Sequence, residues 1–228
     1  NYWSVCAGAG AWQAGANWCD NGVSTSFTQN NLNLQTGVLY YVSVRAVDNA
    51  SNTQSPAINS NGQQVEPTLS FTLSGNTIDF ADLNNGNSWT DSKTGTVTTS
   101  TNASTGYTVS AYLTDYLRSL AYGSQTIANF YGTWANPELW PAGTYGFGYT
   151  SSDTLVQGSN RFNNGTEYAA FSQTASGDVA ADHTDAVNGS TGAVVNEQFT
   201  ITYKVAVSTI QVASTYRTYA VYIVTANY

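Results

Sequence analysis

Alternation of apolar and polar residues with a period of two is the feature that most restricts how this 228-residue chain can fold. Successive side chains of a β-strand point to opposite faces, so this alternation predicts strands with one covered face. The pattern recurs between clusters of Gly, Asn and Ser. Its members on one face are Tyr40, Val42, Val44 and Ala46; Leu69, Phe71 and Leu73; Ile78 and Phe80; Tyr107, Val109, Ala111 and Leu113; Phe199, Ile201, Tyr203, Val205 and Val207; and Tyr219, Val221, Ile223 and Thr225. We therefore expect an all-β fold, with a short helix only within 113–130.

A boundary between two domains is expected at 61–67. There a polar Asn-Gly-Gln-Gln turn runs into Pro67, which cannot donate a hydrogen bond in a β-ladder. The chain is long enough for one large or two modest hydrophobic cores. The sequence therefore predicts two β-sandwich domains of immunoglobulin-like or jelly-roll-like type, at 1–66 and 67–228.

The scarcity of charge limits the partners that this surface can bind. Only 9% of the residues are charged, against about 25% in typical soluble domains. An uncharged polar surface suits packing against further copies, because few charges must lose their water. The net charge of −8 and the six dispersed Lys and Arg residues exclude nucleic acid and anionic membranes as expected partners. No apolar run approaches a membrane span, and the absence of Met predicts a processed product or a fragment.

In the first domain, Leu34, Gly37 and Tyr40 have the spacing L-x-x-G-x-x-Y and run into an alternating strand. With these residues the domain resembles a fibronectin type III domain. The resemblance implies a tyrosine corner, in which the Tyr40 hydroxyl bonds back to the preceding turn. It also implies that the N-terminal strands of this sandwich are missing, so another molecule or a longer polypeptide must cover its core.

Cys6 and Cys19 are the only cysteines. Two cysteines in a chain of secreted composition favour a disulfide, and two independent buried thiols are the alternative. The fibronectin resemblance places the two residues on neighbouring strands. A disulfide that closes this loop would stabilise the fold by about 3 kcal/mol.

The second domain carries packing and turn stretches at 69–74, 78–83, 98–109, 141–148 and 219–226. With these stretches it is similar to the WxL-like and TasA/camelysin-like surface domains of bacteria. The resemblance implies a secreted β-sandwich of the kind found in wall-associated adhesins and in subunits of extracellular fibres.

No constellation of residues in the sequence predicts catalysis. His183 is the only histidine, it lies in the hydrophilic segment 182–185, and no Gly-x-Ser-x-Gly motif accompanies it. We expect a solvated histidine there. The glutamates are scattered without a pairing evident from spacing. The chain is therefore expected to be no enzyme and to need no cofactor.

Asp178, Asp182 and Asp185 lie in a Gly-rich stretch where oxygen ligands could gather around calcium. Their spacing fits no EF-hand, and a solvated acidic loop is the alternative. We therefore expect no metal site, with calcium as the alternative.

Trp134 and Trp140 flank an Asn-Pro turn. Exposed tryptophans on a β-sandwich can stack on sugar rings, whereas buried ones belong to the core and the corners. Both interpretations stay open, and the first makes this pair the expected carbohydrate contact.

The expected function is that of an extracellular structural protein, a self-assembling pilus-like filament or surface-layer subunit whose partners are other copies of itself. Strand complementation between subunits would use the segment with Tyr219, Val221, Ile223 and Thr225. The alternative is an adhesin or carbohydrate-binding module that recognises a cell-surface glycan. A third hypothesis is an accessory domain of a secreted glycan-degrading enzyme.

Overall fold

The computed structural model describes residues 2–3, 10–15, 17–24, 26–30, 32, 34, 38–84, 89–184 and 193–227. Within these residues, the only helical element is the 3-10 turn η1 (Val156–Gly158), and every other regular element is a strand. The prediction of an all-β fold is therefore confirmed. No helix among the described residues is both long and apolar enough to cross a membrane. The chain divides into two compact units, 1–66 and 67–228, and the division falls at Pro67.

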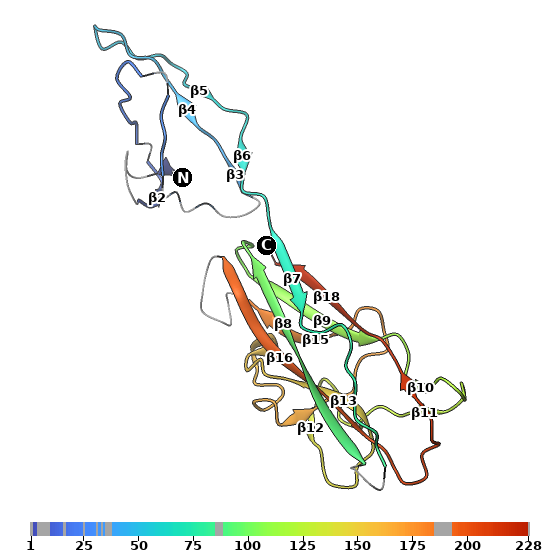
Figure 1. Ribbon diagram of the computed structural model, residues 1–228. Coiled ribbons are helices and arrows are strands. Elements are labelled where there is room, and N and C mark those ends of the chain that lie inside the picture. The colour runs from blue at the N-terminus through green and yellow to red at the C-terminus, as the bar shows by residue number, and fades with distance from the viewer. Residues whose placement is uncertain are drawn as a thin grey trace. The chain divides into compact units, whose positions relative to one another are not determined.

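The described residues of the first unit form three short antiparallel strand pairs. Its strands are β1 (Tyr2–Trp3) with β2 (Trp12–Gln13), β3 (Leu39–Tyr40) with β6 (Gln63–Gln64), and β4 (Ser43–Val44) with β5 (Ile58–Asn59). The last two pairs follow one another along a single two-stranded ribbon, with a hydrogen bond from the Ser60 N–H to the Val42 carbonyl between them (Figure 1). The Asp48 carboxylate closes the turn of the ribbon by accepting the N–H groups of Ala50 and Asn52.

The ribbon has an apolar face that nothing described in the first unit covers. Val42, Val44 and Ile58 share this face, which we call the ribbon face, and they are 66%, 56% and 59% exposed. Arg45 follows Val44 and so points to the opposite face, where its guanidinium lies 4.1 Å from the centroid of the Trp18 ring. None of the buried hydrophobic residues that the structure describes belongs to 1–66.

The second unit is built from two antiparallel sheets (Figure 1). The first has the order β13 (Gly146–Ser151), β16 (Val194–Ala206), β8 (Thr90–Thr101), β7 (Leu69–Leu73), and the second has the order β15 (Asp178–His183), β9 (Tyr107–Leu113), β18 (Ala220–Ala226). Smaller pairings join β10 (Leu117–Ser119) to β11 (Thr126–Ile127) and to β17 (Tyr216–Arg217), and β12 (Glu138–Leu139) to β14 (Glu167–Tyr168).

The period-two pattern produces one hydrophobic core between the two sheets. Along β8, Val97 and Thr99 are buried, while their neighbours Thr96 and Thr98 face outward. The buried residues of β8, β13 and β16 form a single cluster with those of β9 and β15. The two sheets therefore pack face to face as a β-sandwich.

The structure differs from the sequence-based expectations in two elements. The segment 113–130 holds strands β10 and β11 instead of a helix. Ile78 and Phe80 pack against the core but lie in an irregular segment rather than in a strand. In the first case β10 pairs with both β11 and β17, so ladder hydrogen bonds replace those of a helix. In the second, the side chains fill space beside the core without ladder pairing of their backbone.

Ile201 lies at the centre of β16, fully buried between the sheets. We expect Ile201→Ala to lower the free energy of unfolding by about 2 to 5 kcal/mol, through lost burial and an unfilled cavity. Ile223→Ala is the matched control, because Ile223 is 40% exposed on β18, and it should cost less than about 1 kcal/mol. Urea denaturation of the full chain measures both, and equal losses would contradict the assignment of Ile201 to the core.

Candidate functional site

Titratable side chains gather at one end of the sandwich in a group that we call the acid–histidine cluster. Its members are Tyr107 from β9, Asp182 and His183 from β15, Glu197 from β16, and Asp153 from the loop between β13 and η1. Strands from both sheets and one connecting loop therefore contribute to it.

Glu197 links the two sheets. Its carboxylate accepts a 2.7 Å hydrogen bond from the Tyr107 hydroxyl, and its two oxygens lie 3.0 and 3.1 Å from His183 Nδ1. The register of β16 against β8 shifts just before Glu197, where Asn196 has a φ of 52°. A bulge of this kind re-aims the following side chain. Burial and the bond to Glu197 raise the pKa of Tyr107, so the hydroxyl stays a donor.

Asp153 and Asp182 satisfy buried backbone groups. Asp153 accepts the N–H of Asp182 and the N–H of Leu155, both at 2.8 Å, and the Asp182 carboxylate accepts the N–H of Gln157 at 3.2 Å. Both aspartates are 2% exposed. Burial raises the pKa of Asp182 to about 6, and the nearby Asp153 carboxylate adds to the shift. Burial also raises the pKa of Asp153.

The structure corrects the expectation of a hydrophilic loop around His183. Asp182 and His183 lie in β15, and the His183 side chain is only 12% exposed. Asp178 begins the same strand and is half-buried, while Asp185 lies outside the described residues. Within the part of the chain that the structure describes, no group of three or more His, Cys, Asp and Glu residues is placed to hold a metal ion.

Trp134 packs along the edge of β15. Its indole N–H donates a 2.7 Å hydrogen bond to the Val179 carbonyl, and the Arg161 guanidinium lies 3.7 Å from the ring centroid. Arg161 also donates to the Trp134 carbonyl. The guanidinium covers the ring, so Trp134 offers less of the flat platform that a sugar would need.

Trp140 lies in an aromatic group on the outer side of the first sheet. Its ring stacks on Phe130 with a centroid distance of 4.1 Å and an interplanar angle of 9°, and Tyr168 meets it edge-on at 5.4 Å. Phe130 rests on Gly146 and Gly148, where a Cβ would approach Phe130 atoms to 2.9 and 3.0 Å. These two glycines therefore allow the aromatic group to contact the sheet.

A pocket of about 310 Å³ opens beside Trp140. Its wall includes Trp89, Trp140, Tyr145 and Lys204, and we call it the aromatic–lysine pocket. Lys204 Nζ lies 5.0 Å from the Trp140 centroid and 5.2 Å from the Tyr168 centroid. Burial lowers the pKa of Lys204.

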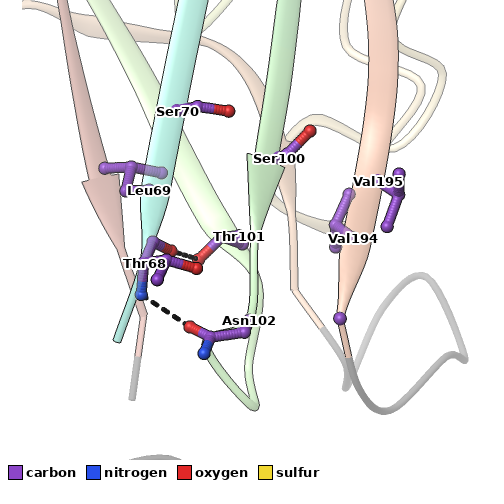
Figure 2. A pocket seen from close by; sticks show the side chains of 9 residues that line it. Thr68, Leu69, Ser70, Ser100, Thr101, Asn102, Val194 and Val195 are labelled. Carbon is purple, nitrogen blue, oxygen red and sulfur yellow. Dashed lines mark hydrogen bonds between the residues drawn. The ribbon is translucent and has the colours of Figure 1, made fainter. Parts of the chain in front are cut away.

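Figure 2 shows a second pocket, of about 260 Å³, at the end of the first sheet. Thr68 and Leu69 lie on one side of it and Val194 and Val195 on the other. Asn102 accepts the Thr68 N–H at 2.6 Å, which fixes the start of β7. Its lining carries no charged side chain, so we assign it no chemistry.

The residues predicted for strand exchange lie on or next to β18. Val221, Ile223 and Thr225 point away from the core, whereas Tyr222 and Val224 pack against it. The Tyr222 hydroxyl lies 2.6 Å from the Tyr203 hydroxyl of β16. The strand is therefore an integral part of its own sandwich, and Tyr219, just before it, is exposed.

The residues predicted for the tyrosine corner and for the disulfide are described only in part. Leu34 is partly buried, and Tyr40 lies in β3 with a partly buried side chain. Gly37 and Cys6 lie outside the described residues, and Cys19 is partly buried. The tyrosine corner and the disulfide both stay predictions.

Sequence reasoning missed Asp153, Glu197 and Lys204. Lys204 is the one charged residue in the alternating stretch 199–207, and this signal could have marked it. Asp153 and Glu197 gave no such signal, because their partners are distant in sequence. Comparison with known proteins found no match, whether among family models, curated proteins or solved structures.

The raised pKa of Asp182 predicts that the fold becomes more stable in mild acid. Its folded pKa of about 6 lies above the reference value of 3.8, so the folded state keeps a proton that the unfolded state releases. Stability is therefore lost as the pH rises through 4 to 6, by up to about 3 kcal/mol. We expect Asp182→Asn to flatten this dependence in urea denaturation between pH 4.5 and 7.5, whereas exposed Asp79→Asn keeps it. Equal slopes for wild type and Asp182→Asn would contradict the prediction.

Proposed function

We propose that the protein is an extracellular structural subunit, in which other copies of the same chain cover the ribbon face and extend its sheets. The observation that carries the proposal is the exposure of Val42, Val44 and Ile58 on one side of a two-stranded ribbon. An isolated two-stranded ribbon is at best marginally stable in water and needs further strands or a second layer. A pilus-like filament or a surface layer would supply that layer.

Covering the ribbon face would favour association of the chain with further copies. Fully burying a Val or Ile side chain contributes about 1.5 to 3 kcal/mol, and more than half of each side chain is still available. The chain has 14 acidic and 6 basic residues in 228. Contacts between copies therefore desolvate few charges, which favours self-association over binding to a charged partner.

The free edge of β18 supports joining by strand addition. The Thr114 N–H donates to the Tyr219 carbonyl, and the Asn227 N–H donates to the Gly106 carbonyl. Hydrogen-bonded and non-hydrogen-bonded pairs alternate along an antiparallel ladder. In this register, the backbone N–H and C=O groups of Tyr222 and Val224 therefore point away from β9. None of the described strands pairs with that side of β18. No Lys, Pro or acidic residue protects it, although such residues commonly block exposed edges.

The two family resemblances and the disulfide belong to the same proposal. A fibronectin type III-like first unit and a WxL-like or TasA/camelysin-like second unit both fit a secreted surface protein. A Cys6–Cys19 disulfide fits an oxidising compartment. A secreted structural role without catalysis is the simplest function that joins these features.

The ribbon face gives the test of assembly. We expect the wild-type chain to form large assemblies whose size depends on concentration, in sedimentation velocity and electron microscopy. Val44→Asp and Ile58→Asp each place a carboxylate at the apolar contact, at a cost of about 2 kcal/mol or more. Each substitution should therefore weaken association by at least about 30-fold.

Asn59→Asp is the matched control for charge. It adds the same charge on the opposite face of the ribbon and keeps an acceptor for the Ser43 hydroxyl, so it should assemble like wild type. Circular dichroism confirms that the variants stay folded. Monodisperse wild-type monomers at high concentration, or unaltered assembly of both Asp variants, would overturn the proposal.

A second candidate function is that of an adhesin or carbohydrate-binding module. The observation that favours it is the position of Trp140 in the wall of the aromatic–lysine pocket, together with Trp89 and Tyr145. Aromatic rings on a β-sandwich surface provide flat apolar platforms for sugars. Trp134 contributes less to this function, because Arg161 covers its ring.

A further inference from the structure

We propose that the aromatic–lysine pocket binds a sugar that carries a carboxylate, such as a uronic acid unit of a surface polysaccharide. The inference names the ligand class for the second candidate function and rests on it. It does not depend on assembly of the chain. Its basis is a partly buried ammonium group that has no counter-ion among the described residues and lies beside aromatic faces in a pocket.

Contacts within the protein hold the aromatic wall of the pocket in place. Phe130 supports Trp140 from the side of the sheet, and the Trp140 indole N–H donates a 3.1 Å hydrogen bond to the Thr144 carbonyl. Phe130 itself is fixed by the approach to Gly146 and Gly148. A preformed wall binds more tightly than a mobile one, because less conformational entropy is lost.

Lys204 is the charged group of the pocket. No described carboxylate lies within salt-bridge distance of its ammonium, and no hydrogen bond from it is found among the described residues. Contact with the Trp140 and Tyr168 rings offsets part of its desolvation. The three N–H donors of the ammonium stay available for an acceptor. Because burial disfavours this charge, an anionic ligand gains more here than a neutral one.

The size and lining of the pocket select a sugar ring among the possible carboxylates. A volume of about 310 Å³ is near the lower end for small-ligand sites, which fits about one ring. Trp89, Trp140 and Tyr145 supply surface for the C–H face of a ring, and Thr90 and Thr209 also line the pocket. A single lysine without basic neighbours does not suit a polyphosphate. A carboxylate on a saturated ring uses both the ammonium and the aromatic wall.

Isothermal titration of the full chain with galacturonic and glucuronic acid oligosaccharides tests the proposal. The matched neutral glucose and galactose oligosaccharides form the comparison arm. We expect millimolar or tighter binding of the uronates and at least about 10-fold weaker binding of the neutral sugars, as for loss of one charge-assisted hydrogen bond. Acetate and N-acetyl-glutamate amide form a third arm, which separates a sugar site from an acidic-peptide site.

Lys204→Met keeps most of the side-chain stem and removes the charge, so it should weaken uronate binding about 10-fold or more. Lys204→Arg should restore part of the affinity. Lys93→Met is the control, because Lys93 lies 3.2 Å from Asp91 outside the pocket, and it should bind like wild type. The proposal is overturned if no uronate binds, if neutral sugars or the glutamate derivative bind equally well, or if Lys204→Met binds normally. Sedimentation of Lys204→Met should match wild type, so a failure here leaves the assembly test unaffected.

Discussion

The ladder between β8 and β16 is the interaction on which the second unit depends. It runs from the pair Thr90–Ala206 to the pair Thr101–Val194 and forms the centre of the first sheet. Because the alternation is in register on both strands, Val97, Ile201 and Tyr203 all face the second sheet. A slip of one residue would turn this entire set to solvent. The same ladder places Lys204 on the outer side and Glu197 on the inner side.

The ribbon of the first unit follows the same period, but among the described residues of this unit no second layer covers its apolar face. Val44 and Ile58 pair across the ribbon as two core residues would, yet both stay exposed. Hydrophobic stabilisation requires removal of area from water. This contrast between the described parts of the two units is the basis of the proposal that further copies cover the ribbon face.

Period-two alternation was sufficient to predict the strands β9 and β16, because one face of each packs against the core. It could not predict which face of β18 is buried, since Val221 and Ile223 are as apolar as Tyr222 and Val224. The strand position of His183 was missed because Asp182 and Thr184 make the segment polar, although backbone N–H groups compensate its buried carboxylates. The proximity of Lys204 to Trp140 depends on tertiary packing that no local pattern encodes.

The two edges of the second sheet differ in whether their outward backbone groups are hydrogen-bonded, and this difference bears on how subunits could join. At the β15 edge, the Trp134 indole N–H donates to the Val179 carbonyl, and the Asp153 carboxylate accepts the Asp182 N–H. These side chains satisfy groups that a neighbouring strand would otherwise pair, so this edge is closed. At the β18 edge, the groups of Tyr222 and Val224 meet no described strand. A sheet with one closed edge and one open edge can be extended in one direction only, and strand addition to it would give each subunit a defined polarity.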